Sequence, residues 1–475
     1  MSNVDWQGKH VTVAGLGVSG IPAARVLHGL GAVVTVVNDG DDERSRTQAA
    51  ELEAQGITVR LGDGATLPKS TELIVTTPGW KPDKPLFTAA AEAGVPVWGD
   101  VELAWRLRGR GGREPAPWLA VTGTNGKTTT VRMLASILEA AGLRTAAVGN
   151  IGVSLLDAVL GEETYDVLAV ELSSYQLHWS PSLRAHSAAV LNLAPDHLDW
   201  HGSMEAYVAD KGRIYEGNTV ACVYNVADPA TEDLVREADV EEGCRAIGFT
   251  LGTPGPSQLG VVDGILVDRA FVTNRQKQAQ ELAEVADVNP PVPHNIANAL
   301  AAAALARAFG VEPAAVRDGL RAFRPDPHRI EHVADVAGVA YIDDSKATNT
   351  HAAEASLASY DPIVWIAGGL AKGATFDELV TGCAERLRGV VLMGADRALI
   401  REALTRHAPE VPVTELDRTD TGAMSEAVRE AARLARPGDT VLMAPACASM
   451  DMFVNYNKRG EAFADAVRTL AAESA

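Results

Sequence analysis

The chain has 475 residues, of which 47% are hydrophobic and 22% charged, and its formal net charge is −20. This length exceeds what one hydrophobic core supports, so several domains are expected. The acidic balance argues against a nucleic-acid partner, because a phosphate backbone selects clustered Lys and Arg. No apolar run reaches membrane-spanning length, and the first six residues lack a basic region followed by an apolar stretch, so neither a membrane span nor secretion is expected. Four scattered cysteines without metal-ligand spacing favour reduced thiols in a cytoplasm.

Alternation of apolar strand-like runs with helical stretches predicts an α/β protein of three domains, because this order builds parallel sheets with helices on both faces. The first and third domains are expected to be Rossmann-like, and the central one to be of the phosphate-loop ATPase type. Residues 106–117, rich in Arg, Gly and Pro, and residues 323–327, which contain two prolines, are interpreted as linkers. The expected domains are therefore residues 1–114, 115–325 and 326–475.

The expected elements follow in chain order. The strands are His10–Ala14, Val33–Val37, Leu73–Thr76, Val95–Trp98, Trp118–Val121, Asp166–Glu171, Ser187–Asn192, Ala340–Ile342, Ile363–Ala367, Gly389–Met393 and Thr440–Ala444. Helices are expected at Ile21–Leu30, from the phosphate loop through Ala141, and at Ile296–Phe309. Short β-like pieces separated by Gly and Pro in residues 220–290 are interpreted as a smaller sheet.

A glycine-rich loop between a strand and a helix carries the strongest functional signal. Its sequence is Gly-Thr-Asn-Gly-Lys-Thr, a shortened Walker loop, in which backbone N–H groups and the helix N-terminus form a positive concavity for phosphate oxygens. Lys127 is expected to reach the terminal phosphates of ATP, and the Thr128 hydroxyl to ligate Mg²⁺. A threonine-capped glycine turn is the alternative. The ATP-binding residues expected here are Gly123, Thr124, Asn125, Gly126, Lys127, Thr128 and Thr129.

A second glycine turn, at residues 15–20, is followed by Asp39 about twenty residues on, as in the dinucleotide fingerprint. From the residues alone, this turn could bind NAD, bind another nucleotide or be merely structural. Residues 76–79 follow a strand at the same sheet edge, and they could contact the same ligand or form a simple turn.

Several polar residues follow other strands. Glu171 ends an apolar strand, where it could ligate Mg²⁺ or be a solvated strand end. His197 is a site candidate, whereas by composition Lys211 is a surface lysine. His294 or Asn295 could merely cap a helix, and a guanidinium at Arg329 could clamp phosphates. Three loops at strand ends, at residues 343–349, 368–373 and 444–453, together predict a second substrate pocket facing the ATP site.

These motifs together resemble the Mur ligases of bacterial peptidoglycan synthesis. The shared set, in chain order, is Gly-Thr-Asn-Gly-Lys-Thr, Glu-Leu-Ser-Ser-Tyr-Gln-Leu, Asn-x-x-x-Asp-His-Leu-Asp, His-Asn-x-x-Asn, His-Arg-x-Glu, Asp-Ser-Lys-Ala-Thr-Asn and Pro-Ala-Cys-Ala-Ser. The resemblance as a whole extends from about residue 8 to residue 465. The phosphate loop and the histidine and asparagine motifs are also similar to folylpolyglutamate synthases. The last two loops resemble those of the Mur ligases that add D-glutamate.

The resemblance implies roles for individual residues. It implies binding of a UDP-linked substrate by Val18, Ser19, Asp39, Thr77, Pro78, Gly79, Asn150 and Ser173. It implies catalytic and Mg²⁺-binding positions at Lys127, Thr128, Glu171, His197 and Lys211, with Lys211 carried as a carbamate. Asn295, Asn298, Arg329 and Asp344 match nucleotide contacts with His328 and Lys346 beside them, and Thr348, Lys372, Ser449, Met450 and Tyr456 match the D-glutamate pocket.

The implied activity is ATP-dependent amide formation through an acyl phosphate, with two Mg²⁺ ions. The implied partners are UDP-N-acetylmuramoyl-L-alanine and D-glutamate, bound by a monomer. A Mur ligase for another amino acid or a folylpolyglutamate synthase remains an alternative of the same chemistry. An NAD-dependent oxidoreductase and a non-catalytic UDP-sugar sensor are alternatives of other classes.

Overall fold

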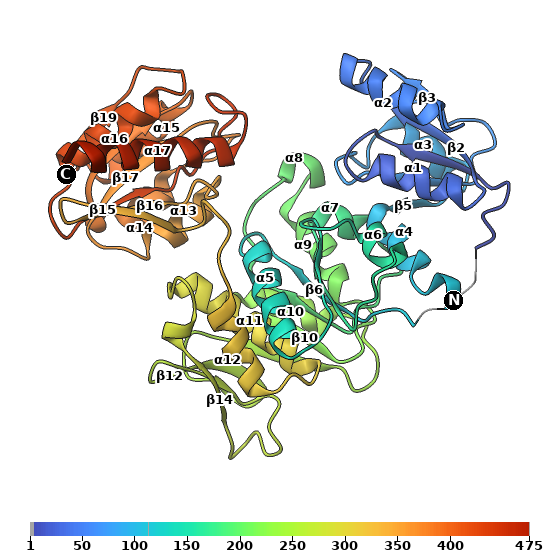
Figure 1. The fold of residues 1–475 in the computed structure, drawn as a ribbon, viewed down its shortest axis with the longest axis horizontal. Helices are drawn as coiled ribbons and strands as arrows, with labels where there is room; N and C mark the ends of the chain where they lie inside the picture. The colour runs from blue at the N-terminus through green and yellow to red at the C-terminus, as the bar shows by residue number, and fades with distance from the viewer. Residues whose placement is uncertain (1–3, 113, 475) are drawn as a thin grey trace. The chain divides into compact units, whose positions relative to one another are not determined.

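A computed structural model describes residues 4–112 and 114–474 (Figure 1). The first three residues of the N-terminal segment and residue 113 of the first expected linker therefore lie outside the described part. The chain forms two compact units, one of residues 1–288 and 296–323 and the other of residues 289–295 and 324–475. Within the described residues, no helix is both long and apolar enough to cross a membrane.

The N-terminal sheet of the first unit has five parallel strands in the order β3-β2-β1-β4-β5. The strands are β1 (His10–Ala14), β2 (Val33–Asn38), β3 (Thr58–Leu61), β4 (Leu73–Thr76) and β5 (Val97–Gly99), and the helices are α1 (Gly20–Gly29), α2 (Glu43–Glu53), α3 (Pro85–Glu92) and α4 (Asp100–Leu107). The chain runs from β1 to β2 on one side and later to β4 on the other. The carboxyl ends of β1 and β4 therefore border the switch point at which open α/β sheets bind ligands.

The central sheet of the same unit has nine strands, in the order β14-β13-β12-β11-β10-β9-β6-β8-β7. They are β6 (Trp118–Thr122), β7 (Ala147–Gly149), β8 (Leu168–Glu171), β9 (Ser187–Val190), β10 (Ala221–Asn225), β11 (Arg245–Phe249), β12 (Gln258–Val262), β13 (Ile265–Asp268) and β14 (Gln280–Glu284). The expectation of a smaller sheet in residues 220–290 is wrong. Strand β10 pairs in parallel with β9, and β11 and β12 continue that pairing, so these strands extend the central sheet.

Helices cover the central sheet. They are α5 (Lys127–Ala140), α6 (Leu155–Leu160), α7 (Ser174–His178), α8 (Leu198–His201), α9 (Met204–Gly212), α10 (Pro229–Glu237), α11 (Pro293–Ala308) and α12 (Pro313–Ala322), with short 3-10 segments at Arg110–Gly112, Arg213–Tyr215 and Val285–Asp287. Leu134 of α5 and Leu300 of α11 are fully buried in one cluster on one face. Trp105 of α4 packs edge-on against Trp118 of β6 with ring centroids 5.0 Å apart. This contact explains why the first expected linker does not separate two compact units.

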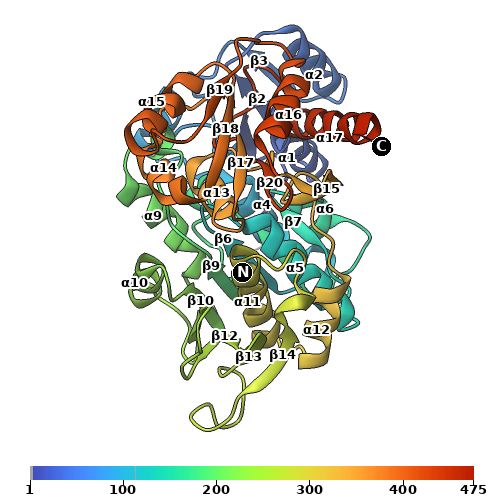
Figure 2. The same ribbon diagram turned by 90° about the vertical axis from the view of Figure 1, so that its left-hand side faces the viewer.

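The second unit holds a six-stranded sheet, in the order β15-β16-β20-β17-β18-β19, in which only β15 is antiparallel. Its elements are β15 (Glu331–Val336), β16 (Val339–Asp343), α13 (Thr350–Leu357), β17 (Ile363–Gly368), α14 (Asp377–Cys383), a 3-10 segment (Ala384–Arg386), β18 (Leu387–Met393), α15 (Arg397–His407), β19 (Val413–Glu415), α16 (Ala423–Leu434), β20 (Thr440–Met443) and α17 (Tyr456–Ser474). Trp365 of β17 lies in the core beneath α13–α15, whereas its neighbour Ile366 lies beneath α16 and α17. Figure 2 shows these two helix layers on opposite sides of the sheet. The strand has period 2, so buried residues on both faces explain its continuous apolar sequence.

The α/β class predicted from the sequence is confirmed, and the described residues form three sheets, which agrees with the three expected α/β domains. Several strand boundaries agree to the residue, including β1 and β4. Strand β5 begins at Val97, two residues later than expected, after Pro96. The second expected linker contains the boundary between the two units at Phe323 and Arg324.

Candidate functional site

The phosphate loop connects the end of β6 to the start of α5, as the sequence predicts. Gly123 has a φ of +147° and Gly126 a φ of +84°, conformations that favour glycine. Asn192 holds the turn from outside, because its Oδ1 accepts from the Asn125 backbone N–H at 2.8 Å and its Nδ2 donates to the Asn125 carbonyl at 3.1 Å. The loop is therefore rigidly placed at the N-terminus of a 14-residue helix, whose dipole favours an anion there.

Two lysines meet at this loop. Lys127 Nζ donates to the carbonyls of Gly123 and Thr124 at 2.9 and 2.8 Å. Lys211 Nζ donates to the same Gly123 carbonyl at 2.9 Å. Lys211 is only 2% exposed, so the expectation from composition that it is a surface lysine is wrong. Burial, and then the charge of Lys127, hold the pKa of Lys211 well below its usual value, which favours a neutral amine.

Glu171 lies at the end of β8, beside the phosphate loop. The residue is 2% exposed, which excludes the solvated strand end. Its Oε1 accepts from Asn150 Nδ2 at 3.0 Å, whereas Oε2 is buried and has no hydrogen-bond partner among the described residues. Its charge raises the pKa of Lys211, which places the carboxylate within electrostatic reach of the amine. A buried carboxylate oxygen without a donor is suited to a cation.

His197 precedes α8 and has a left-handed φ of +55°. Its ring lies 4.8 Å from the ring of Tyr175, and its Nε2 lies 3.4 Å from Oδ2 of Asp196. Burial lowers the pKa of His197, the charge of Asp196 opposes that fall, and the charge of Lys127 adds to it. A neutral imidazole beside the phosphate loop can act as a ligand or as a hydrogen-bond partner.

Mg²⁺ prefers oxygen ligands, and this edge of the sheet offers the free Glu171 oxygen and the Thr128 hydroxyl in the first turn of α5. An unmodified amine at Lys211 is a poor ligand for Mg²⁺, because this hard cation prefers oxygen to nitrogen. Conversion of the amine to a carbamate would supply an anionic oxygen instead. The donor set therefore fits Mg²⁺, and it fits better with Lys211 modified.

The first glycine turn and the loop at residues 76–79 lie against each other. A Cβ on Gly15 would meet Oγ1 of Thr77 and Nε1 of Trp80 at 2.7 Å, so only glycine permits this approach. Asp39 forms an ion pair with Lys84, and Val18 is 93% exposed at the tip of the turn. The expected adjacency of the two loops is thus observed.

The remaining residues expected at the UDP-linked substrate divide between two places. Ser19 precedes α1 at the glycine turn, whereas Asn150 lies beside Glu171 and Ser173 caps α7 by accepting from the Gln176 N–H at 3.2 Å. A backbone hydrogen bond of 2.8 Å, from the Gly99 N–H to the Trp179 carbonyl, connects the end of β5 to the end of α7 and so links the two groups.

Asp100 lies at this junction and was not anticipated from the sequence. Burial raises the pKa of Asp100 to about 6, and its Oδ1 has no hydrogen-bond partner among the described residues. Oδ2 accepts from Nε2 of Gln176 at 3.5 Å. The position of Asp100 directly after β5 was the available signal, because carboxyl ends of parallel strands border ligand sites.

The nucleotide residues expected after residue 290 divide between the two units. Asn298 belongs to the first unit, and its Oδ1 would lie 2.4 Å from a Cβ on Gly126. Asn295, Arg329 and Asp344 belong to the second unit. Burial raises the pKa of Asp344 to about 6, and the charge of Arg329 opposes that rise.

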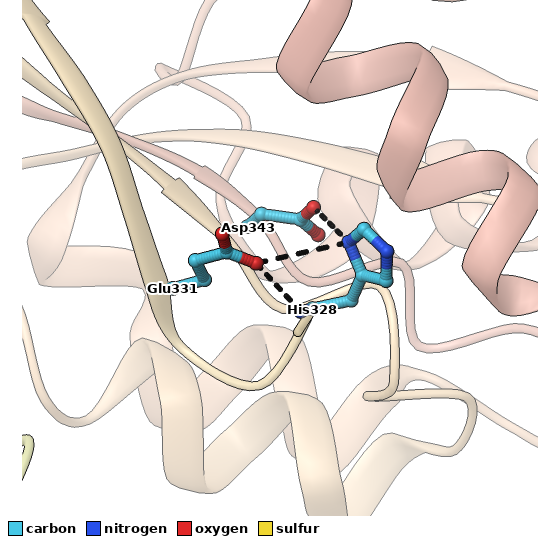
Figure 3. A group of neighbouring side chains, drawn as sticks. All are labelled: His328, Glu331 and Asp343. Carbon is cyan, nitrogen blue, oxygen red and sulfur yellow. Dashed lines mark hydrogen bonds and ion pairs between the residues drawn. The ribbon is translucent and has the colours of Figure 1, made fainter. Parts of the chain in front are cut away.

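His328, Glu331 and Asp343 bring three potential metal ligands within 4.8 Å of one another (Figure 3). His328 Nδ1 lies 2.7 Å from Oδ2 of Asp343, and the His328 backbone N–H donates to Oε2 of Glu331 at 2.8 Å. The hydrogen bond to Asp343 raises the pKa of His328. Because these side chains pair with one another, the cluster is an ion-pair network that holds the turn before β15. It thereby also holds the position of Arg329.

Three loops of the second unit come together as expected. Leu370 and Ala448 exchange two backbone hydrogen bonds of 2.9 Å, which join the loops at residues 368–373 and 444–453. Arg459 of α17 is 1% exposed and joins the loop at residues 343–349 to the same region, because it donates to Ser345 O at 2.9 Å and to Cys447 O at 3.1 Å. The sequence did not reveal Arg459, since an arginine in an amphipathic helix normally lies on the surface.

The residues expected for D-glutamate all lie on or beside these joined loops. Met450 is 59% exposed, whereas Ser449 is 4% exposed. Lys346 Nζ lies 4.1 Å from the ring centroid of Tyr456, a cation–π contact. Thr348 follows Ala347, whose carbonyl accepts from the Ala446 N–H at 2.9 Å. Lys372 has a left-handed φ of +50° in the loop after β17.

The phosphate loop, its two lysines and the sheet order define a nucleotide-binding α/β protein. Family models match three stretches of the chain: the Mur ligase MurD-like N-terminal domain at residues 9–99, the Mur ligase middle domain at residues 121–306 and the Mur ligase glutamate ligase domain at residues 328–447. The UDP-N-acetylmuramoylalanine–D-glutamate ligase of Streptomyces coelicolor is 86% identical, over 98% of this chain and 99% of that protein. The proteins of the same name from Streptomyces avermitilis and Thermobifida fusca are 87% and 59% identical, each over 98% of this chain and 100% of the relative. The chain therefore belongs to the Mur ligase family.

Solved structures of Mur ligases share the fold. MurF from Acinetobacter baumannii has a TM-score of 0.58 at 17% identity, with 92% of this chain and 91% of that chain covered. MurF ligase from Thermotoga maritima in complex with ADP has a TM-score of 0.57 at 18% identity, with 99% of this chain and 96% of that chain covered.

Proposed function

We propose that this chain joins D-glutamate to UDP-N-acetylmuramoyl-L-alanine in an ATP-dependent reaction that forms an amide, ADP and phosphate for peptidoglycan synthesis. The choice of substrates rests on the names of the relatives that are 86% and 87% identical over nearly the whole chain. The chemistry rests on one observation, a buried Glu171 oxygen that has no partner among the described residues and lies near the two lysines that contact the phosphate loop. Both substrates and ATP are anionic, so a locally basic site within an acidic protein suits them.

Residues of the first unit would hold ATP and Mg²⁺. Gly123, Thr124, Asn125, Gly126, Lys127, Thr128, Thr129 and Asn298 would bind the nucleotide, and Thr128, Glu171, His197 and a carbamylated Lys211 would hold two Mg²⁺ ions. Bound Mg²⁺ would neutralise phosphate oxygens and so stabilise the charge that develops during phosphoryl transfer. Asn295, Arg329 and Asp344 of the second unit would contribute further nucleotide contacts.

The chemical problem is that a carboxylate has no leaving group for attack by an amine. Transfer of the ATP γ-phosphoryl to the L-alanyl carboxylate gives an acyl phosphate, and attack by the D-glutamate amine then expels phosphate. Lys127 would keep positive charge at the transferring group, and the rigid loop would keep the reacting atoms in line. No side chain needs to form a covalent bond, because positioning and electrostatics supply the catalysis.

The substrate residues fall into two sets. Val18, Ser19, Asp39, Thr77, Pro78, Gly79, Asn150 and Ser173 would bind the UDP-linked substrate, and Thr348, Lys372, Ser449, Met450 and Tyr456 would bind D-glutamate. We also propose functional domains of residues 1–114, 115–325 and 326–475, and a monomer active in the cytoplasm, where ATP and UDP-linked precursors are available.

The decisive experiment measures phosphate release with ATP, Mg²⁺ and UDP-N-acetylmuramoyl-L-alanine against a panel of amino acids. D-Glutamate is expected to support turnover, whereas L-glutamate, L-alanine and L-lysine are not. Turnover that depends on another amino acid, or on a folate in place of the UDP-linked substrate, would refute the proposal. The carbamate at Lys211 is tested by removal of bicarbonate, which should lower the rate until bicarbonate is restored.

A further inference from the structure

A second polar cluster lies on helices α7, α8 and α9, next to Lys211, and has no role in the chemistry above. Its centre is Asp210, one residue before Lys211 on α9. His178 Nδ1 lies 2.9 Å from both Asp210 oxygens, and His201 Nδ1 lies 2.9 Å from Oδ2. Arg213 adds an ion pair at 3.2 Å.

The cluster extends through His201 to Ser174. His201 Nε2 lies 2.9 Å from Oγ of Ser174, which is 2% exposed, and the His201 side chain is 0% exposed. A carboxylate only accepts hydrogen bonds, so Nδ1 of His201 carries a proton toward Asp210, and Nε2 shares a hydrogen bond with the Ser174 hydroxyl. The arrangement has the order of a Ser-His-Asp triad, but the buried serine gives a substrate no access. The cluster therefore fixes the positions of the elements around it and does not carry out nucleophilic attack.

The contacts of Asp210 join the elements that carry the proposed Mg²⁺ ligands. His178 ends α7 and Ser174 begins it, so Asp210 holds both ends of this five-residue helix, directly or through His201. Strand β8, which ends in Glu171, leads into α7. His201 ends α8, which starts directly after His197. One carboxylate thus fixes three elements that present three separate ligands.

We propose that Asp210, acting through His201, is a positioning residue that holds Lys211 at the phosphate loop and sets its geometry relative to Glu171 and His197. The proposal rests on the proposed function only for the identity of the ligands, because the position of Lys211 can be tested without turnover. A hydrogen bond to a buried charge contributes more than one between neutral groups. Loss of the Asp210 carboxylate therefore removes the contacts of α9 with α7 and α8 at the residue next to Lys211.

The first experiment measures exposure of Lys211 without metal, nucleotide or bicarbonate. The protein reacts with trinitrobenzenesulfonate, and labelling of each lysine is followed by peptide mass spectrometry. In wild-type protein Lys211 should be protected, and Asp210→Asn should label it about tenfold faster, the factor that about 1.4 kcal/mol represents. Lys458, whose side chain is 60% exposed, serves as the internal reference. Asp233→Asn, the same change in an exposed ion pair on α10, is the matched control.

Two variants of His201 keep the test decisive if Asp210→Asn fails to fold. Asparagine places an N–H where Nδ1 of histidine lies, whereas glutamine places one where Nε2 lies. His201→Asn should therefore keep Lys211 protected, and His201→Gln should expose it. Equal labelling in these two variants, or a wild-type labelling rate in Asp210→Asn, would overturn the proposal.

The second experiment separates this inference from the proposed function. In the phosphate-release assay, Asp210→Asn should raise the Mg²⁺ concentration needed for half-maximal rate by about 10- to 100-fold, the usual effect of losing support behind a metal ligand. KM for D-glutamate should not change, because its proposed residues lie on the second unit. If wild-type protein shows no D-glutamate-dependent release, the proposed function fails while the labelling result still decides the role of Asp210. An unchanged Mg²⁺ dependence in an active variant would count against the positioning role alone.

Discussion

Replacement of Gly126 by alanine tests the geometry of the phosphate loop most directly. Gly126 has a φ of +84°, and an added Cβ would lie 2.4 Å from Oδ1 of Asn298, closer than real Cβ atoms approach. The left-handed backbone costs alanine about 1–2 kcal/mol. Displacing Asn298 adds roughly 1–3 kcal/mol, which is typical of overpacking. The two costs total about 2–5 kcal/mol. The loop is expected to relax out of its binding conformation, with affinity for ADP and Mg²⁺ reduced about 30- to 5,000-fold.

Isothermal titration with ADP and Mg²⁺ measures this loss, and thermal unfolding shows whether the first unit remains folded. Gly142→Ala is the matched control at the other end of α5, because its φ is +78° and no atom lies within 4 Å of its added Cβ. This control carries the backbone strain without the overlap, so its nucleotide affinity should equal that of wild type. In stability measurements, Asn298→Ala should recover the part of the Gly126→Ala loss that arises from overlap. Wild-type affinity in Gly126→Ala would refute the reasoning.

Three further predictions concern single side chains. Lys127→Ala should abolish D-glutamate-dependent phosphate release, because Nζ supplies positive charge at the phosphate loop. Thermal unfolding should change little, and a wild-type rate of release would contradict the proposed role. His328→Gln should destabilise the second unit more at pH 6 than at pH 9. The hydrogen bond to Asp343 raises the pKa of His328. The stabilisation that this hydrogen bond gives the folded state is therefore fully present below the ordinary pKa of 6.5 and is lost as pH rises through the raised pKa. A loss of stability that is the same at both pH values in thermal denaturation would contradict this prediction. Arg459→Met should raise KM for D-glutamate about tenfold, because the Ser345 carbonyl loses a charged donor worth about 1.5–3 kcal/mol; an unchanged KM in steady-state kinetics would reject this.

Local sequence was sufficient wherever the structure itself is local. Strand β6, the loop and helix α5 lie within residues 118–140, and the strand–loop–helix order is as expected from the sequence. The α/β class also followed from local periodicity, because alternating elements leave few ways to bury their apolar faces. Lys211 was predicted as a site residue from the resemblance to the Mur ligases, because no hydrophobic periodicity pointed to it.

Pairing between distant strands could not be predicted in the same way. The strands of residues 220–290 have the short, interrupted pattern of a small sheet, but β10 finds its partner in β9. Similarly, Trp105 and Trp118 pack together across the first expected linker, and both belong to one compact unit. Both outcomes depend on apolar area that is buried only after the chain folds.

The sequence by itself determined the phosphate loop, the α/β class and, through its motifs, the family. The tertiary structure decided the electrostatic state of the site, because desolvation and neighbouring charges come from segments far apart in the chain. It placed Lys211 at a carbonyl 88 residues away, and it left one Glu171 oxygen without a donor among the residues that the structure describes. It also assembled Asp210, His201 and Ser174, whose individual residues carry no signal. Burial is a property of the folded assembly, and burial is what gives these groups their altered chemistry.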